Sequence, residues 1–262
     1  MGVPSSASAA ERELTAQQHY DLGVRYMKRG YYTKAIEEFN RVRNFYRDDP
    51  ASLKAEIAIA DMHFEKGEFE PARLAYEDFA RLHPRHEDMD YVVYRIGLCH
   101  YKRAPRVAGR DQSSTRQALM VWTGFSERFP SSEHLADVQE MQLKAKDRLA
   151  RKELDIARFY ARRGAWQATQ RRAEGLVRKY PDSRYAEEAE ALLAEAWFER
   201  GAVTQAQAVR EDLAQAHPES PWLHAIDRTL AGPPGTPPAE ETFVRPVHIP
   251  GMGMASPSQP AQ

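Results

Sequence analysis

The segment KRGYYTKAI, residues 28–36, places a glycine at position 30 and an alanine five residues later. The arrangement recurs as EKGEFEPARL (65–74), RRGAWQATQ (162–170) and ERGAVTQAQ (199–207), with threonine replacing alanine in the third copy. Gly30 and Gly67 lie 37 residues apart, as do Gly164 and Gly201. Glycine readily adopts the left-handed conformation that ends a helix, and a small residue lets a second helix cross the first closely. Repeats of this length predict an all-α fold of stacked helical hairpins.

The spacing predicts an α-solenoid of about five tetratricopeptide-type hairpins, of which the third is stretched. Its first helix contains Gly97 and its second Ala118, which are 21 residues apart, whereas the corresponding Gly23 and Ala35 of the first hairpin are 12 apart. The extra residues fall around 103–114 and include a proline and a glycine, so we expect a loop insert there.

A stretch without glycine or proline follows, from residue 132 to 163. Ser132 is a good helix start, and the stretch is rich in strong helix formers. It predicts one long helix, or two joined by a bend near residues 148–152. This long helix should link an N-terminal half (16–131, hairpins one to three) to a C-terminal half (132–220, the long helix with hairpins four and five).

The two ends of the chain differ from the repeats. Residues 1–15 are small and polar and lack the charged start and apolar core of a secretion signal. Residues 232–262 contain eight prolines and four glycines. Such segments bury too little apolar surface to fold, so we expect both to be disordered.

Composition excludes several classes of protein. The net charge is −1, from 37 basic and 38 acidic residues, so nothing global indicates binding to nucleic acid. No stretch approaches the roughly 18 apolar residues of a transmembrane helix. Cys99 is the single cysteine, which precludes an internal disulfide and is typical of a buried structural thiol.

The charges are segregated along the chain. Residues 144–184 contain thirteen Lys or Arg and five Asp or Glu, whereas residues 47–90 contain six and twelve. Arg148 and Arg162 belong to a series at near-helical spacing that shares a broad face. Two interpretations stay open, a solvated face and a docking surface for an acidic partner.

Motifs for catalysis are missing from the sequence. His83 and His86 flank Pro84, which places them on a turn, and no cysteine supports them as metal ligands. There is no phosphate-binding glycine loop and no nucleophile elbow. We therefore expect no enzyme activity, no catalytic residue, no metal site and no cofactor.

Three stretches are more specific than the generic repeat positions. They are HP (83–84) with MDYVVY (89–94) and GL (97–98); KDRLA (146–150) with FY (159–160) and RGAW (163–166); and RAEGL (172–176) with YPDS (180–183). Through these, and through the insert and long helix, the chain from about residue 17 to 220 resembles the BamD/YfiO family of repeat lipoproteins. That family belongs to the outer-membrane β-barrel assembly machinery.

The resemblance implies two binding regions. In the family the N-terminal repeats are thought to receive the aromatic-rich C-terminal targeting segment of unfolded outer-membrane proteins, and here Tyr32 and Tyr46 are the candidate contacts. The C-terminal repeats of the family dock on the periplasmic domain of the central barrel subunit. Arg172 matches a family arginine that pairs with an acid on that subunit, and Arg148, Arg162 and Arg163 are candidate contacts beside it.

The resemblance also implies partners and a location. The expected partners are the central β-barrel subunit, other lipoprotein subunits and unfolded outer-membrane clients, with no nucleic acid. The expected location is the periplasmic face of the outer membrane, although the lipid-bearing cysteine that anchors the family is absent from this sequence. The alternative is another periplasmic or cytoplasmic repeat adaptor that serves cell-envelope or pilus assembly.

Overall fold

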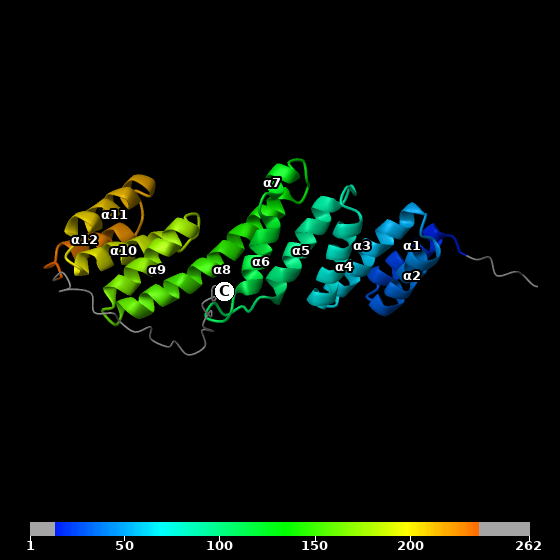
Figure 1. Cartoon of the computed structure of the whole chain (residues 1–262), viewed down its shortest axis with the longest axis horizontal. Coiled ribbons are helices and arrows are strands. Elements are labelled where there is room, and N and C mark those ends of the chain that lie inside the picture. Colours follow the sequence, from blue (N-terminus) through cyan, green and yellow to red (C-terminus); the bar gives the residue numbers. More distant parts are fainter. Residues whose placement is uncertain (1–13, 236–262) are drawn as a thin grey trace, which may run out of the picture. The chain divides into compact units, whose positions relative to one another are not determined.

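A computed structural model describes residues 14–235, and all regular structure within them is helical (Figure 1). The predicted all-α fold of helical hairpins is therefore confirmed. The chain divides into two compact units, an N-terminal unit that ends at Arg103 and a C-terminal unit that begins at Ala104. Most of the predicted disordered ends, residues 1–13 and 236–262, lie outside the described residues.

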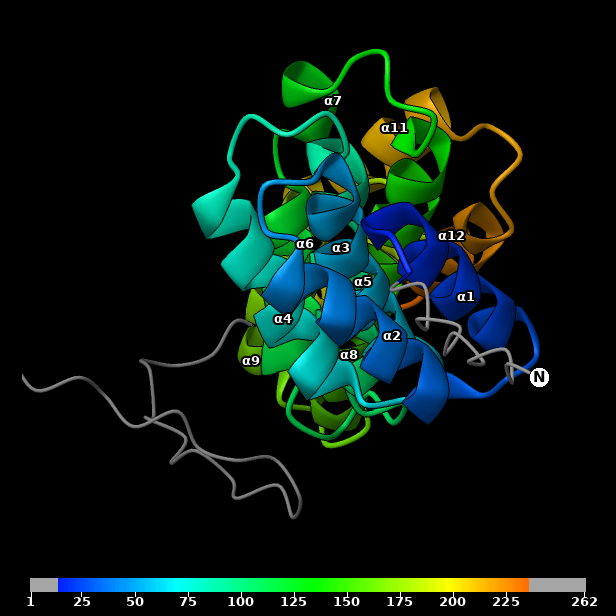
Figure 2. The same ribbon diagram turned by 90° about the vertical axis from the view of Figure 1, so that its right-hand side faces the viewer.

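The N-terminal unit is a series of antiparallel helices in which each packs on the next (Figures 1 and 2). Its members are α1 (Ala16–Lys28), α2 (Tyr32–Phe45), α3 (Pro50–Glu65), α4 (Phe69–Leu82) and α5 (Met89–Arg103). Phe39, Tyr76 and Phe79 are among its fully buried side chains. Because each hairpin buries its apolar face on its neighbour, the unit has a continuous core.

The repeated glycines end helices as the sequence predicts. Gly30 and Gly67 adopt φ of 75° and 78°, in the left-handed region that suits glycine. Gly23 has a different role, because a Cβ at this position would lie 2.5 Å from the ring of Phe39. The small residues five positions after the turns, Ala35 and Ala72, are completely buried at the helix crossings.

The C-terminal unit is arranged around one long helix. Its members are α6 (Ser113–Trp122), α7 (Phe125–Arg128), α8 (Leu135–Ala161), α9 (Trp166–Lys179), α10 (Ala186–Glu199), α11 (Val203–Ala216) and α12 (Trp222–Leu230). α8 is continuous over 27 residues, so of the two sequence readings the single helix holds. It packs against α6, α9 and α10 (Figure 1).

The loop insert precedes α6 and is held by one buried side chain. The amide Nε2 of Gln112 donates to the carbonyl oxygens of Pro105 and Val107, both at 3.1 Å. Gln112 is completely buried, and its Oε1 accepts from the hydroxyl of Thr115 at 2.6 Å. The insert is therefore an ordered part of the unit.

Three features differ from the sequence prediction. The units divide after Arg103, whereas the sequence suggested residue 131, because α6 packs on α8 within the second unit. The second helix of the third hairpin is broken at Gly124, whose φ is 72°, into α6 and α7. Residues 222–230, which the sequence left unassigned, form the amphipathic helix α12, whose Ile226 is buried.

The described fold extends by a few residues into each of the two ends that the sequence predicts to be disordered. Thr15 caps α1, because its side chain accepts from the backbone N–H of Gln18 while the side chain of Gln18 accepts from the N–H of Thr15. At the other end, the N–H of Gly235 donates to the carbonyl of Phe198 at 3.2 Å. Residues 14–15 and 232–235 are thus part of the described fold.

Candidate protein-binding surfaces

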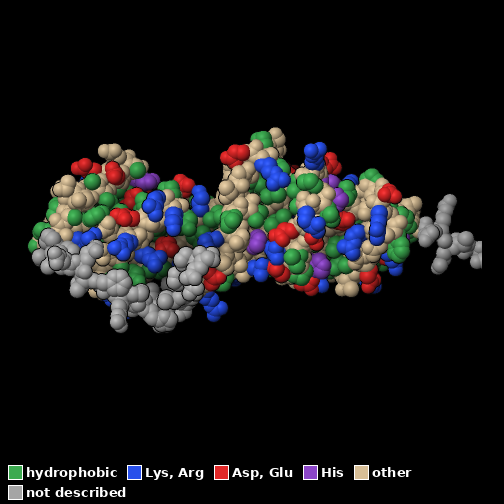
Figure 3. Space-filling view, in the orientation of Figure 1, with side chains coloured by type: hydrophobic (Ala, Val, Ile, Leu, Met, Phe, Trp, Pro, Cys, Tyr) green, Lys and Arg blue, Asp and Glu red, His purple; other side chains and the backbone are tan. Residues whose placement is uncertain are grey.

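Exposed basic side chains gather over α9 and the adjoining part of α8 (Figure 3). We define this α8–α9 basic surface by the exposed Arg162, Arg163, Arg171, Arg172, Arg178 and Lys179. Ala173 and Leu176, on the opposite side of α9, are completely buried against the rest of the unit. Because these buried residues fix the orientation of α9, its basic residues face the solvent.

Part of the basic excess found in the sequence is neutralised inside the unit. Arg158 Nη2 lies 2.5 Å from Glu188 Oε1, which links α8 to α10. Asp147 is buried on α8 and accepts from Arg184 Nε at 2.7 Å and from the Ser183 hydroxyl at 2.9 Å. These partly exposed arginines join the turn between α9 and α10, and α10 itself, to α8, so their charges are paired within the unit.

Two of the four predicted contact residues lie together at the end of α8. Arg162 is the C-cap residue of α8, and Arg163 follows it. The guanidinium carbon of Arg163 lies 3.6 Å from the ring centroid of Phe159, and its Nη1 donates to the carbonyl of Phe159 at 3.3 Å. Arg162 has no ionic partner among the described residues.

The other two predicted contacts lie farther along the unit. Arg172 is exposed on α9, and its Nη1 donates to Glu153 Oε2 on α8 at 2.9 Å. Arg148 is half-buried on α8 and 14 residues before Arg162, which corresponds to about 21 Å along the helix axis. The four arginines are therefore spread along the α8–α9 hairpin and do not form one cluster.

On α9 the sequence singled out Arg172 alone, and counted the other cations without assigning them a role. Arg171, Arg178 and Lys179 are exposed and have no ionic partner in residues 14–235. Arg171 and Arg178, like Arg172 and Lys179, are seven residues apart, a spacing that places each pair on one side of a helix. That spacing was the signal that could have found them.

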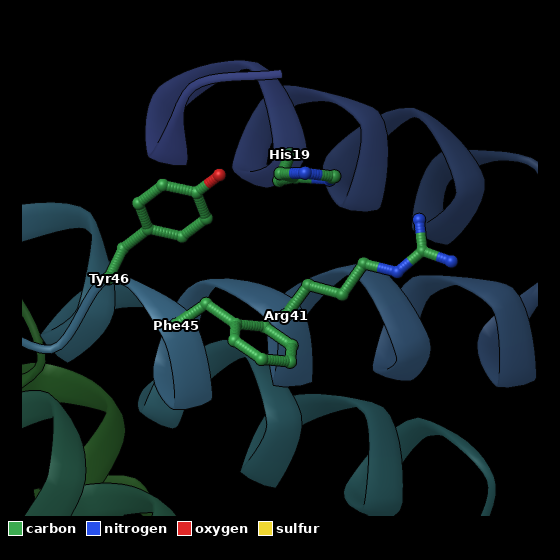
Figure 4. Close-up of a pocket in the computed structure, with 4 residues that line it drawn as sticks. All are labelled: His19, Arg41, Phe45 and Tyr46. Atoms are coloured by element: carbon green, nitrogen blue, oxygen red, sulfur yellow. The ribbon is translucent and has the colours of Figure 1, made fainter. Parts of the chain in front are cut away.

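The N-terminal unit has a hollow of about 550 Å³ lined by His19 of α1, Arg41 and Phe45 of α2, and Tyr46 (Figure 4). Behind it, Glu38 is buried between two basic groups. His19 Nδ1 lies 2.7 Å from Glu38 Oε2, and Arg41 Nη1 lies 3.1 Å from Glu38 Oε1. The buried carboxylate thereby holds both basic side chains at the wall of the hollow.

Aromatic surface is unusually exposed at the same place. Phe45 is 77% exposed although it is a large apolar residue. The hydroxyl of Tyr46 donates to the carbonyl of Leu14 at 2.7 Å, and its ring lies 6.0 Å from that of His19. The hollow thus combines a half-exposed guanidinium with aromatic walls, which suits an extended segment that carries an aromatic ring and a negative group.

The two predicted client contacts are not brought together. Tyr46 lines the hollow, whereas Tyr32 is half-buried and packs on the core formed by α1, α2 and α3. They lie at opposite ends of α2, 14 residues or about 21 Å apart. Phe45 and Arg41 were missed, although two consecutive aromatics at a helix end cannot both face inward.

The structure adds two negative findings, both limited to residues 14–235. No three His, Cys, Asp or Glu side chains there are grouped closely enough to hold a metal ion. None of the helices is both long and apolar enough to cross a membrane.

The stacked hairpins with their glycine turns define a tetratricopeptide-type helical-repeat protein. A comparison with family models makes this more specific, since the family described as YfiO, an outer membrane lipoprotein, matches residues 12–225. The chain belongs to this family, as its resemblance predicted.

Several curated relatives carry the name outer membrane protein assembly factor BamD. The protein of Neisseria meningitidis serogroup A is 29% identical over 201 residues, which cover 73% of this chain and 75% of the relative. The protein of Xylella fastidiosa is 28% identical over 223 residues, which cover 82% of this chain and 76% of the relative. The protein of Vibrio cholerae is 26% identical over 223 residues, which cover 82% of this chain and 92% of the relative. Among solved structures, the TPR2AB-domain:pHSP90-complex of yeast Sti1 is 15% identical over 82% of both chains, with a TM-score of 0.47.

Proposed function

We propose that this protein is a non-enzymatic scaffold subunit of the machinery that assembles β-barrel proteins in the outer membrane, at its periplasmic face. The observation that carries the proposal is the family match, which spans both structural units. The assembly factors named among the relatives match over most of their own length, which supports the same role for the whole chain. In this role the protein joins the barrel subunit, other lipoprotein subunits and unfolded clients.

The α8–α9 basic surface is proposed to bind the periplasmic domain of the central barrel subunit. Arg172 pairs with Glu153 at the surface of the unit, and exposed ion pairs contribute only about 0–1 kcal/mol to stability. Arg172 can therefore exchange Glu153 for an acid on a partner at little cost. Arg162 and Arg163 extend the positive charge to the end of α8, and such charge sets the register and the association rate.

The hollow of the N-terminal unit is proposed to bind the targeting segment of an unfolded outer-membrane protein. Phe45 and Tyr46 offer aromatic surface, and Arg41 offers a positive charge for a carboxylate. Glu38 already pairs with Arg41, so a client carboxylate would share the guanidinium, which has five N–H donors. Tyr32 remains a predicted contact, distinct from this hollow.

The barrel-subunit interaction is tested by Arg172→Glu, with binding to the purified periplasmic domain measured by calorimetry. We expect the Kd to rise about tenfold or more, because like charges then face each other across the interface. Arg228→Glu is the matched control, since Arg228 is exposed on α12 of the same unit. Equal binding by both variants and the unchanged protein would contradict the proposed interface.

The client interaction is tested with a fluorescent peptide that has the sequence of the last strand of an outer-membrane barrel protein. Phe45→Ala and Arg41→Glu should each weaken peptide binding several-fold, because each removes one of the two recognition elements of the hollow. Leu82→Ala is the control, since Leu82 is a 58% exposed apolar residue on α4 that does not line the hollow. A loss confined to Tyr32→Ala would move the client site to the other end of α2.

A further inference from the structure

Gly175 lies in the middle of α9, and no contact within residues 14–235 requires a glycine there. The other glycines discussed above have one, since Gly30 and Gly67 adopt positive φ and Gly23 lies against the ring of Phe39. A Cβ added at Gly175 would meet nothing within 4 Å, and its φ lies outside the left-handed region. Glycine is the least favourable residue in a helix interior after proline, so alanine would be the better residue for this fold.

Four exposed basic side chains lie around Gly175. Arg171, Arg172, Arg178 and Lys179 lie four and three residues before it and three and four residues after it. Residues at these separations are neighbours on a helix surface, so the four cations surround Gly175, which is itself partly exposed. All four are exposed, and Figure 3 shows basic side chains gathered over α9.

Acidic groups on the same helix compensate little of this charge. Glu174 is the one acidic residue of α9, and its Oε1 accepts from Gln170 Nε2 at 2.8 Å. Glu153, from α8, reaches only Arg172. The face around Gly175 is thus complementary in charge to an acidic polypeptide.

We propose that Gly175 is the point of closest approach on this surface, where an acidic segment of the partner lies directly against the backbone of α9 between the four cations. The proposal rests on the proposed function, which makes the partner the periplasmic domain of the barrel subunit. Without a Cβ, α9 admits the partner about one methyl group closer than any other residue would. The cations can then reach its carboxylates from both sides of the contact.

The test compares Gly175→Ala and Gly175→Leu with the unchanged full-length protein. Gly175→Ala should raise the melting temperature by about 2–4 °C, because alanine favours the helix, and yet increase the Kd for the periplasmic domain several-fold. Gly175→Leu should increase that Kd at least about tenfold, because its side chain occupies the space of the partner. Ala208→Leu, at an exposed position of α11, is the control for added bulk and should bind normally.

The outcomes separate this inference from the function on which it rests. A Kd for Gly175→Leu within twofold of the unchanged protein, with Arg172→Glu still impaired, would overturn the role of Gly175 and leave the barrel-subunit interface standing. Impaired binding by Gly175→Leu with normal binding by Ala208→Leu would support it. If the unchanged protein does not bind the periplasmic domain, both the partner assignment here and the proposed function fail.

Discussion

The two units repeat the same helical hairpin but connect their helices by different interactions. In the N-terminal unit Asp61 of α3 accepts hydrogen bonds from the hydroxyls of Tyr76 on α4 and Tyr91 on α5. Arg95 donates to the Tyr76 hydroxyl at 2.9 Å and stacks 3.9 Å from the ring centroid of Phe64. Burial, followed by the charge of Asp61, raises the pKa of both tyrosines, so the network is neutral at its hydroxyls.

In the C-terminal unit the ion pair that connects α8 to α10 lies near the surface. Arg158 on α8 pairs with Glu188 on α10, and 41% of the Arg158 side chain is exposed. A buried network fixes geometry more strictly than an exposed pair, because its members have no water to replace a lost partner. The comparison shows that the Arg95 network is a buried connection that stability depends on, whereas the Arg158–Glu188 pair leaves its cation accessible to solvent.

The largest effect should follow removal of Arg95. Arg95→Ala removes the cation that faces Asp61 and the donor to the Tyr76 hydroxyl in a largely buried site, and the loss of one member of a buried ion pair costs about 3–5 kcal/mol. Urea denaturation followed by circular dichroism measures the change in the free energy of unfolding. Arg81→Ala is the control within the same unit, since its pair with Asp78 is mostly exposed, and a similar loss in both variants would refute the comparison.

A smaller loss is expected from Gly23→Ala in α1. The new Cβ would overlap the ring of Phe39, which is completely buried. Overpacking of this kind costs roughly 1–3 kcal/mol, which a shift in melting temperature would detect. Gly109→Ala adds the same methyl group where nothing lies within 4 Å, and unchanged melting of both variants would show that the helix crossing is loosely packed.

Arg158→Ala should have little effect on stability. The pair with Glu188 is partly exposed, so its loss should cost no more than about 1 kcal/mol. The same urea titration measures it. A loss as large as that of Arg95→Ala would mean that the two units are secured in the same way after all.

The smallest change is expected at Cys99 of α5. Burial raises the pKa of its thiol to about 12, so at pH 8 almost all of it is protonated and unreactive. A thiol reagent should therefore leave the folded protein unmodified for hours, yet modify it promptly in urea. Rapid labelling without denaturant would indicate that the N-terminal unit opens more readily than its buried network suggests.

Much of the fold followed from the sequence because the decisive features are local. A glycine turn and a small residue five positions later specify a hairpin without reference to the rest of the chain, and Ala35, Ala72 and Ala206 are all completely buried. The break at Gly124 was missed because the apolar spacing from Trp122 to Phe125 continues through it. α12 could have been found, since Trp222, Leu223 and Ile226 follow helical spacing after a proline.

The candidate surfaces were less predictable, because they depend on which side chains tertiary packing leaves exposed. The resemblance provided Arg172 and Tyr46. It could not show that Arg172 already pairs with Glu153, or that Phe45 is exposed next to Tyr46. Likewise, the charge count of residues 144–184 could not separate Arg158, which pairs internally, from Arg178, which does not. Partners across helices are set by the fold, and only the structure reveals them.

The stacking of Arg163 on Phe159 has a consequence for the kinetics of recognition. A freely rotating arginine loses about 2 kcal/mol of side-chain entropy when a partner immobilises it, whereas one already resting on a ring has lost much of that freedom beforehand. The Arg163 side chain is thus preorganised in the unbound protein. In the proposed complex, a partner that contacts Arg163 first would therefore lose less side-chain entropy at that contact than at an arginine without a ring beneath it.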